Sequence, residues 1–324
     1  MTAKVFIDGD VGTTGLQIRR RLEGRADLQL IRLDEDRRKD ADARREMLAE
    51  ADVAILCLPD DASREAAAMA DDIGPGAARL IDASSTHRVT DGWVYGMPEW
   101  DAGQPARIAE AGRVANPGCY AISSVAMLHP LVEAGIIPAD HPVTLNAISG
   151  YSGGGKKLIA SFEDGADAAH AKTAYFVYGL GLTHKHLPEI QRWGGLANPP
   201  LFMPSVGRYR QGMITQLPLI LGALPGKPSP DDIHGALAAQ YAGCRFLTVA
   251  DMADAAALTE LDPESVNGTN ELRLHVFANA ERGHVVVAAL IDNLGKGASG
   301  LAVQNLNLML GVDEGVGLEE AVVL

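Results

Sequence analysis

The chain is poor in cysteine, in aromatic residues and in long apolar runs. Its 324 residues include only three cysteines, an odd and small number that favours free thiols in a reducing compartment over a disulfide framework. No segment approaches the roughly 18 apolar residues that span a bilayer. The opening residues resemble neither a signal peptide nor a transit peptide. We therefore expect a cytoplasmic protein.

Positive charge is also scarce. Lysine and arginine number 28 against 42 aspartates and glutamates, which gives a net charge of −14. Such a surface repels nucleic-acid backbones and anionic lipids, so neither is an expected partner. A few local arginines or lysines can still bind an anionic small molecule. Glycine, by contrast, is plentiful at 35 residues, as in proteins that use glycine turns to carry ligands.

The length predicts two domains, and the first hundred residues alternate between strands and helices. Alternation of this kind predicts a Rossmann-type, doubly wound parallel sheet. We expect strands at Lys4–Ile7, Leu28–Leu33, Asp52–Leu58 and Arg79–Asp82, and helices at Leu16–Glu23, Arg37–Leu48 and Ala62–Ala70.

The pattern changes near Pro117. A long apolar helix is expected from Cys119 to Ala134, and β-rich stretches then follow with few helices between them. This order predicts an α+β domain built on a mostly antiparallel sheet. Its expected strands are Val143–Ser149, Gly212–Leu221, Leu272–Phe277 and His284–Ile291, and a last helix is expected at Ser299–Leu310.

A glycine turn follows the first expected strand. Gly9, Gly12 and Gly15 form a G-x-x-G-x-x-G variant of the dinucleotide fingerprint, between a strand and a helix. Such glycines let the backbone approach a pyrophosphate at a helix N-terminus. Asp10 lies inside the turn and would repel a pyrophosphate unless its side chain points away. A tight turn without a ligand is the alternative interpretation.

The end of the second expected strand carries residues that could bind the adenosine ribose. Asp34 lies 19 residues after Gly15, where dinucleotide-binding domains place an acidic residue. Arg37 and Arg38 follow and could instead bind a ribose phosphate, which favours NADP over NAD. A solvated helix face is an equally good interpretation of these two arginines.

Cys119 is the candidate nucleophile. It follows Asn116-Pro117-Gly118, a sharp turn, and opens the long apolar helix. A helix N-terminus favours the thiolate and so lowers the pKa of a thiol. A lowered pKa makes cysteine a nucleophile at neutral pH. Taken alone, Cys119 could equally be a small buried apolar residue.

Two histidines flank Lys185 in an extended segment before Pro188. Because side chains alternate along extended backbone, His184 and His186 point the same way, and either could serve Cys119 as acid or base. Surface or capping histidines are the alternative. A metal site is not expected, because no third ligand stands at a suitable spacing.

Two further segments could bind anions. Ser84 and Arg88 follow the fourth expected strand, at the edge where such sheets bind ligands, and Arg88 could clamp a carboxylate or phosphate. Ser149, Gly150 and Lys156 belong to a glycine-rich stretch suited to phosphate, although it lacks the P-loop pattern. A surface arginine and a flexible loop are the alternatives.

Together these motifs resemble one family. The segments Asn116–Tyr120, His184–Glu189 and Asp292–Gly300 look like those of N-acetyl-γ-glutamyl-phosphate reductases, the arginine-biosynthesis members of the aspartate-semialdehyde dehydrogenase-like group. The short length and the stretch SGYSGGGK resemble the second subtype of that family. The resemblance runs from residue 4 to residue 310.

The resemblance implies a reaction. NADPH would reduce N-acetylglutamyl 5-phosphate to N-acetylglutamate 5-semialdehyde with release of phosphate. Cys119 would form a thioester, and a histidine would act as acid and base. His186 is favoured over His184, because a nearby helix N-terminus would keep it neutral. The expected small-molecule partner is thus an acyl phosphate. The chain itself is expected to form a homotetramer or homodimer.

The resemblance also implies roles for other residues. The cofactor would contact the glycine turn with Thr13 and Thr14, and further residues at the C-terminal motif, namely Asn293, Gly297 and Ala298. Asn116 would join Arg88, Ser149, Gly150 and Lys156 in holding the substrate. The implied domains are residues 1–117 with 298–324 for NADP, and 118–297 for catalysis and oligomerisation.

Other functions remain open from the sequence. The same chemistry could act on aspartyl phosphate or an aminoadipyl phosphate. A Rossmann protein could also sense dinucleotides without catalysis, in which case Cys119 could be replaced without loss. A cysteine hydrolase is a third alternative, and it would need neither the glycine turn nor a nicotinamide cofactor.

Overall fold

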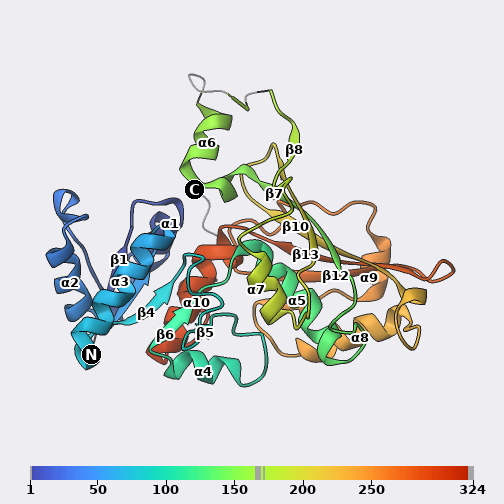
Figure 1. The fold of residues 1–324 in the computed structure, drawn as a ribbon, viewed down its shortest axis with the longest axis horizontal. Helices are drawn as coiled ribbons and strands as arrows, with labels where there is room; N and C mark the ends of the chain where they lie inside the picture. Colours follow the sequence, from blue (N-terminus) through green and yellow to red (C-terminus); the bar gives the residue numbers. More distant parts are fainter. Residues whose placement is uncertain (1, 165–168, 171, 320–324) are drawn as a thin grey trace. The chain divides into compact units, whose positions relative to one another are not determined.

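The computed structural model describes residues 2–164, 169–170 and 172–319. The chain folds into two compact units (Figure 1). The first unit comprises the residues up to Pro98, then Ala102–Gly118, and then the residues from Ala298 onward. The second unit comprises Glu99–Asp101 and Cys119–Gly297.

The first unit is built on a parallel sheet, as the strand–helix alternation predicts. Its six strands pair in the order β2-β1-β3-β4-β6-β5, and every pairing is parallel. The order reverses between β1 and β3, the place where doubly wound sheets bind ligands at the carboxyl ends of their strands. The strands are β1 (Ala3–Asp8), β2 (Leu28–Ile31), β3 (Val53–Leu56), β4 (Arg79–Asp82), β5 (Val94–Tyr95) and β6 (Arg113–Ala115).

The three helices expected in the first unit all differ from expectation in their boundaries, and the one expected over Ala62–Ala70 spans Asp60–Ile73. The first helix begins at Thr13 instead of Leu16, because Gly12 serves as its N-cap. The helix expected over Arg37–Leu48 is broken: a short 3-10 turn ends at Arg37, and the Asp40 side chain then caps a new helix by accepting the N–H of Ala43 at 3.0 Å. The helices are α1 (Thr13–Leu22), α2 (Ala41–Glu50), α3 (Asp60–Ile73), α4 (Gln104–Glu110) and α10 (Gly300–Leu310), with 3-10 turns at Glu35–Arg37 and Gly74–Gly76.

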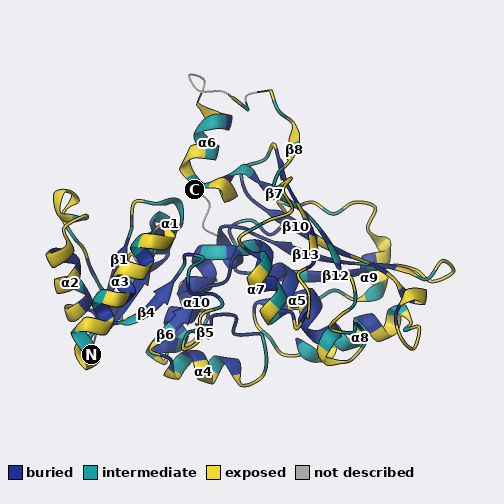
Figure 2. Cartoon of the chain, viewed as in Figure 1, coloured by how far each residue is buried: buried dark blue, intermediate teal, exposed yellow. Residues whose placement is uncertain are grey.

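Helix α10 completes the first unit from the far end of the chain. It packs against α1, α4 and β4, and Figure 2 shows it buried along most of its length. Arg79 on β4 donates to the Met309 carbonyl at 2.6 Å, and Asn305 donates to the Gly96 carbonyl at 2.9 Å. A π-helical turn, Gly295–Ser299, leads into α10, where the sequence predicts only the start of an α-helix.

The second unit has a seven-stranded sheet in the order β11-β12-β13-β10-β7-β9-β8. Four of its six pairings are antiparallel, in agreement with the expected α+β domain. The strands are β7 (Thr144–Gly150), β8 (Tyr175–Val177), β9 (Leu201–Gly207), β10 (Met213–Ile220), β11 (Leu247–Val249), β12 (Leu272–Asn279) and β13 (His284–Ile291). The helices are α5 (Cys119–Glu133), α6 (Gly155–Glu163), α7 (Leu187–Trp193), α8 (Pro230–Gln240) and α9 (Met252–Ala257), with 3-10 turns at Tyr151–Gly154 and Leu221–Ala223.

This sheet is covered unequally on its two sides. Helix α5 packs on β10 and β13, α8 packs on β11 and β12, and α5 is buried through most of its length (Figure 2). Along β10, alternate residues are exposed, and Ile220 is 63% exposed. Across the same sheet, Leu201 and Met203 on β9 are 45% and 44% exposed. Exposed apolar residues on a sheet mark a surface that can meet another protein chain.

Within the described residues, no helix combines the length and the apolar character that a membrane crossing needs.

Candidate functional site

The thiol of Cys119 stands at the start of α5, as the sequence predicts. The residue is partly exposed and forms no disulfide. Helix α5 has no acidic residue in its first turn, so the positive end of its dipole is not offset there. Gly297 lies directly against this cysteine, because a Cβ at Gly297 would come within 2.8 Å of the Cys119 Cβ. Only glycine leaves the thiol room at that point.

The two histidines lie together. The rings of His184 and His186 have centres 4.8 Å apart, while Lys185 between them is exposed. The His186 N–H is 3.1 Å from Nδ1 of His184, which accepts that hydrogen bond. A neutral His184 therefore carries its proton on Nε2. His186 is 5% exposed and is the N-cap residue of α7, with φ −87° and ψ −9°, so the segment expected to be extended up to Pro188 is already helical in backbone angles at His186.

Tyr120 connects the thiol and the histidines. It follows Cys119 in α5, is 4% exposed, and its ring centre lies 5.8 Å from His184 and 6.0 Å from His186. Burial raises the pKa of Tyr120 well above its ordinary value, and the neighbouring Tyr178 and Cys119 raise it further. Burial likewise raises the pKa of Tyr178 to about 12. Both phenols therefore stay neutral beside Cys119.

The glycine-rich stretch after β7 meets the same cluster at Ser149. Ser149 is 2% exposed, its hydroxyl donates to the Gly150 carbonyl at 3.0 Å, and its interaction with the Tyr120 hydroxyl lowers the pKa of that phenol against the effect of burial. Gly150 is packed so closely that a Cβ would come within 2.5 Å of the Arg210 carbonyl oxygen. Lys156, in the first turn of α6, is exposed. Cys119, both histidines and Ser149 thus gather around Tyr120, whereas Lys156 lies at the surface of the second unit.

In the first unit, the glycine turn has the form that a dinucleotide needs. Gly9 has φ +92°, and a Cβ there would overlap the carbonyl oxygen of Cys57 after β3. A Cβ at Gly15 would overlap the Gly9 carbonyl oxygen. Gly12 is the N-cap residue of α1, and no side-chain cap hydrogen bond forms there. The N–H groups of Thr13 and Thr14, at the positive end of the helix dipole, are therefore available to a ligand. The turn fits a dinucleotide pyrophosphate.

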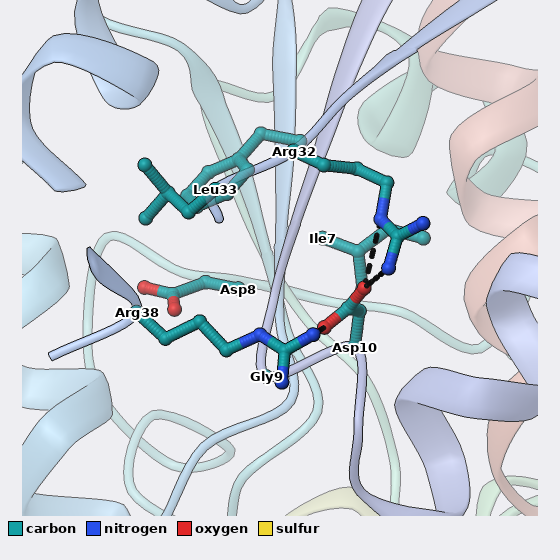
Figure 3. Close-up of a pocket in the computed structure, with 8 residues that line it drawn as sticks. Ile7, Asp8, Gly9, Asp10, Arg32, Leu33 and Arg38 are labelled. Carbon is teal, nitrogen blue, oxygen red and sulfur yellow. Dashed lines mark hydrogen bonds and ion pairs between the residues drawn. The ribbon is translucent and has the colours of Figure 1, made fainter. Parts of the chain in front are cut away.

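The Asp10 carboxylate points toward three arginines. Arg32 donates to Asp10 Oδ2 from Nε at 3.0 Å and from a terminal nitrogen at 2.8 Å. Arg38 and Arg19 lie 3.6 and 3.7 Å from the same carboxylate. Figure 3 shows Arg32 and Arg38 converging on Asp10 in a pocket at the end of β1.

The other predicted cofactor residues of the first unit are placed as follows. Asp34 is exposed and caps the 3-10 turn after β2. Arg37 lies near Asp40 and Glu46 at 3.9 and 3.6 Å, and it does not line the pocket beside Asp10. Ser84 donates to Asp82 Oδ2 at 2.8 Å, within a buried network at the end of β4.

Two predicted substrate residues brace the backbone of the first unit. Arg88 is 7% exposed and donates from Nε to the Asn116 carbonyl at 3.0 Å. The Asn116 side chain donates to the Ala298 carbonyl at 3.1 Å and accepts from Asn305 at 3.0 Å. Arg88 and Asn116 therefore fix the turn that precedes Cys119. They belong to a different unit from Ser149, Gly150 and Lys156.

Asn293 is tied into the second unit. Its side-chain oxygen accepts the Gly212 N–H at 2.8 Å, and its Nδ2 donates to Ser152 Oγ at 3.0 Å. Next to it, the Asp292 carboxylate accepts from Gln211 and from the Gly268 N–H, and burial raises the pKa of Asp292. These bonds fix the backbone just before Gly297, which packs on the thiol.

Two residues of these clusters, Arg32 and Tyr178, are not predicted from the sequence. Arg32 was expected inside a strand over Leu28–Leu33, but β2 ends at Ile31, so its side chain is free to turn to Asp10. Its position at a strand end, before Asp34, is the signal that could have found it. Tyr178 carries no comparable signal, because only the folded sheet brings it beside His184, with ring centres 5.9 Å apart.

Both units match known protein families. Residues 4–110 match the family model described as semialdehyde dehydrogenase, NAD binding domain. Residues 119–293 match the model described as semialdehyde dehydrogenase, dimerisation domain. The two matched stretches lie on either side of the turn at Asn116-Pro117-Gly118.

Curated relatives are similar over nearly the whole chain. N-acetyl-gamma-glutamyl-phosphate reductase 2 of Pseudomonas putida is 53% identical over 310 residues, which cover 96% of this chain and 97% of that protein. The N-acetyl-gamma-glutamyl-phosphate reductase of Brucella melitensis is 51% identical over 311 residues, with 96% and 100% covered.

Solved structures share the fold at low identity. Aspartate semialdehyde dehydrogenase II of Vibrio cholerae, complexed with ASA, superposes with a TM-score of 0.69 at 16% identity, over 96% of this chain and 99% of that one. The aspartate semialdehyde dehydrogenase of Francisella tularensis gives a TM-score of 0.71 at 14% identity, over 95% and 100%. At such identities the likeness establishes the fold.

Proposed function

The chain belongs to the family of N-acetyl-γ-glutamyl-phosphate reductases, and from this premise we propose that it reduces N-acetyl-L-glutamyl 5-phosphate to N-acetyl-L-glutamate 5-semialdehyde with NADPH. The reaction releases phosphate and serves arginine biosynthesis. The observation that carries the proposal is the cluster at the start of α5, where Tyr120 joins the thiol of Cys119 to the rings of His184 and His186.

Cys119 is the nucleophile of this reaction. Its thiolate sulfur bonds to the acyl carbon, the bond from that carbon to the phosphate oxygen breaks, and phosphate leaves. NADPH, when bound, supplies a hydride to the resulting thioester carbon. The thiohemiacetal then expels the Cys119 sulfur and leaves the aldehyde. A helix N-terminus stabilises the thiolate in both the first and the last step.

One histidine handles the proton. A base takes the proton from the Cys119 thiol before attack, and the same group gives a proton to the oxygen as the thiohemiacetal forms. It takes this hydroxyl proton back when the Cys119 sulfur leaves. We assign this role to His186. His184 has its Nδ1 engaged by the His186 N–H, so it orients the segment. Neutral phenols at Tyr120 and Tyr178 add no negative charge that would disfavour the thiolate.

The binding roles predicted from the sequence are part of this proposal. We assign the substrate's charged groups to Arg88, Asn116, Ser149, Gly150 and Lys156. We assign the cofactor to the glycine turn at Gly9, Gly12 and Gly15 with Thr13 and Thr14, and to Asp34, Arg37, Ser84, Asn293, Gly297 and Ala298. Residues 1–117 with 298–324 form the proposed NADP domain, and 118–297 the catalytic and oligomerisation domain.

The match to a dimerisation domain supports a homo-oligomer. We propose a homodimer or homotetramer that uses the exposed apolar face of the second-unit sheet at Leu201, Met203 and Ile220. A cytoplasmic location is proposed because the described cysteines form no disulfide and a thiolate nucleophile needs a reducing compartment.

The reverse reaction tests the proposal without the unstable acyl phosphate. N-acetylglutamate 5-semialdehyde, NADP⁺ and inorganic phosphate are supplied to the wild type and to Cys119→Ser. We expect phosphate-dependent NADPH formation that falls by about 10³-fold or more in the variant, because serine is a far weaker nucleophile at neutral pH. Unchanged circular dichroism of the variant would exclude unfolding as the cause.

Two results would contradict parts of this proposal. Activity with aspartate semialdehyde in place of the acetylated aldehyde would keep the thioester chemistry and change the substrate. No NADPH formation with either aldehyde, in protein that binds NADPH, would overturn the reductase function and favour a dinucleotide sensor.

A further inference from the structure

The carboxylate of Asp10 gathers arginines from three separate segments. Arg19 comes from α1, Arg32 follows β2, and Arg38 follows the 3-10 turn Glu35–Arg37. Arg32 makes two hydrogen bonds to one oxygen of Asp10, and Arg38 approaches the other oxygen at 3.6 Å (Figure 3). One side chain inside the glycine turn thus fixes cationic groups that the sequence alone does not bring together.

The carboxylate lies beneath its arginines. The Asp10 side chain is 10% exposed, whereas those of Arg32 and Arg38 are 49% and 28% exposed. The guanidinium groups therefore keep some N–H donors exposed to solvent, while other N–H groups contact Asp10. In the part of the chain that the structure describes, Nε of Arg38 has no hydrogen-bond partner.

The charge of this cluster favours an anion. Three guanidinium groups face one buried carboxylate, and the nearby Asp8 is already paired with Arg44 at 2.8 Å. The remaining acidic contacts are exposed: Glu23 pairs with Arg19 and Glu35 with Arg38, and these carboxylates are 55% and 91% exposed. Neither of them hydrogen-bonds Arg32 as Asp10 does, and Asp10 is far less exposed than Glu35, which lies equally 3.6 Å from Arg38.

From this geometry, and resting on the proposed NADPH-dependent function, we propose that Asp10 is a positioning residue for cofactor choice. It holds Arg32 and Arg38 so that they bind a phosphate monoester on the adenosine ribose. Asp10 thereby sets the preference for the phosphorylated dinucleotide over the unphosphorylated one, although its own charge is negative.

Two effects of Asp10 oppose each other, and their sizes decide the sign. Its negative charge weakens the attraction of the cluster for a phosphate dianion. Its hydrogen bonds to Arg32 and its ion pair with Arg38 reduce the entropy that these flexible side chains would otherwise lose on binding. The first effect is reduced because contact with guanidinium groups offsets the carboxylate charge and water screens exposed charges. The positioning effect therefore dominates.

Binding of two nucleotides that differ by one phosphate tests the proposal. Isothermal titration calorimetry compares adenosine 2′,5′-bisphosphate with adenosine 5′-monophosphate, without any turnover. The wild type binds the bisphosphate more tightly. Asp10→Asn weakens bisphosphate binding by about tenfold, the cost of ordering two arginines, and changes monophosphate binding by less than about twofold. Asp10→Glu, which keeps the carboxylate, restores part of the loss.

Glu35→Gln is the matched control. It removes the same charge from an exposed contact of Arg38 without freeing Arg32. We expect the affinities of this variant for both nucleotides to stay within about twofold of the wild type. Arg32→Met should weaken binding of the bisphosphate alone, because it removes a donor group and leaves the glycine turn unchanged.

The proposal fails if Asp10→Asn binds the bisphosphate as tightly as the wild type, or more tightly. It also fails if Glu35→Gln reproduces the effect of Asp10→Asn, since charge alone would then explain it. A wild type without preference for the bisphosphate would overturn it too. Cys119-dependent, phosphate-dependent dehydrogenation with NAD⁺ would in that case leave the proposed reaction standing, so the two failures are distinguishable.

Discussion

The two units of this protein differ in how far their ion pairs are buried. In the first unit, Asp10 shares its carboxylate among arginines that reach the solvent. In the second unit, the Lys296 ammonium is fully buried and donates to Glu99 Oε1 at 2.7 Å, with the Phe246 ring centre 5.7 Å away. Exposed, shared ion pairs add little stability but can bind a ligand, whereas a buried pair is costly to break. We therefore distinguish charged groups that can bind a ligand from charged groups that stabilise the fold.

The largest difference between the two units is expected from replacing a catalytic residue of the second unit and a cofactor-binding residue of the first. His186→Asn is expected to lower kcat by about 10²- to 10⁴-fold with little change in the KM for NADP⁺, because it removes the acid–base group. Arg32→Met should do the reverse and raise that KM with little change in kcat. Steady-state kinetics in the reverse direction measure both.

His184→Asn is the control for this experiment. An asparagine oxygen can accept the His186 N–H as Nδ1 of His184 does, so kcat should fall by less than about tenfold. Equal losses in the two variants would mean that His184 shares the proton transfer, and a larger loss in His184→Asn would reverse the assignment.

The buried ion pair gives the next largest effect. Lys296→Met leaves the Glu99 carboxylate buried without its ammonium, so the free energy of unfolding should fall by about 3–5 kcal/mol. Arg32→Met, at a half-exposed pair, should cost less than about 1 kcal/mol. Urea unfolding monitored by circular dichroism measures both. Similar losses in the two variants would remove the distinction drawn between the units.

Two glycines with similar backbone angles provide a third test. Gly9 and Gly24 have φ of +92° and +84°, but only Gly9 lies against other atoms. Gly24→Ala should cost about 1 kcal/mol for the left-handed backbone. Gly9→Ala adds overlap with the Cys57 carbonyl, and we expect a cost of about 3 kcal/mol with loss of nucleotide binding. Equal melting temperatures would show that the turn can shift.

Salt should reveal the smallest difference. Raising the ionic strength from about 0.05 to about 0.5 M should weaken binding of adenosine 2′,5′-bisphosphate severalfold, because the arginines near Asp10 are exposed to screening. The rate at which neutral iodoacetamide alkylates Cys119 should change by less than about twofold. A stronger salt effect on alkylation than on binding would contradict the comparison.

The local part of this structure was predictable from the sequence, and the long-range part was not. The strand–turn–helix around Gly9 and the start of α5 at Cys119 follow from neighbouring residues, and the predicted strand His284–Ile291 matches β13. The break before α2 depends on Asp40 competing as a helix cap, which a charged run conceals. The roles given to Cys119 and the histidines remain predictions.

Side-chain partners distant in the sequence account for what was missed. The pairing of Arg32 with Asp10 depends on β1 and β2 lying side by side, and on β2 ending at Ile31. The bonds of Asn293 to Gly212 and Ser152 depend on how the second-unit sheet folds. Periodicity reports which face of an element is apolar, but it does not report which polar groups meet.

The return of the chain to the first unit has a consequence for biosynthesis. The ribosome makes the parallel sheet before the second unit, yet it makes α10, which packs on β4 and α4, after that unit. The nascent chain therefore exposes apolar surface of its first-made unit until the whole second unit has been translated. Removal of the segment from Gly300 onward should therefore destabilise the first unit more than the second. A stalled or truncated chain would expose apolar surface that chaperones bind.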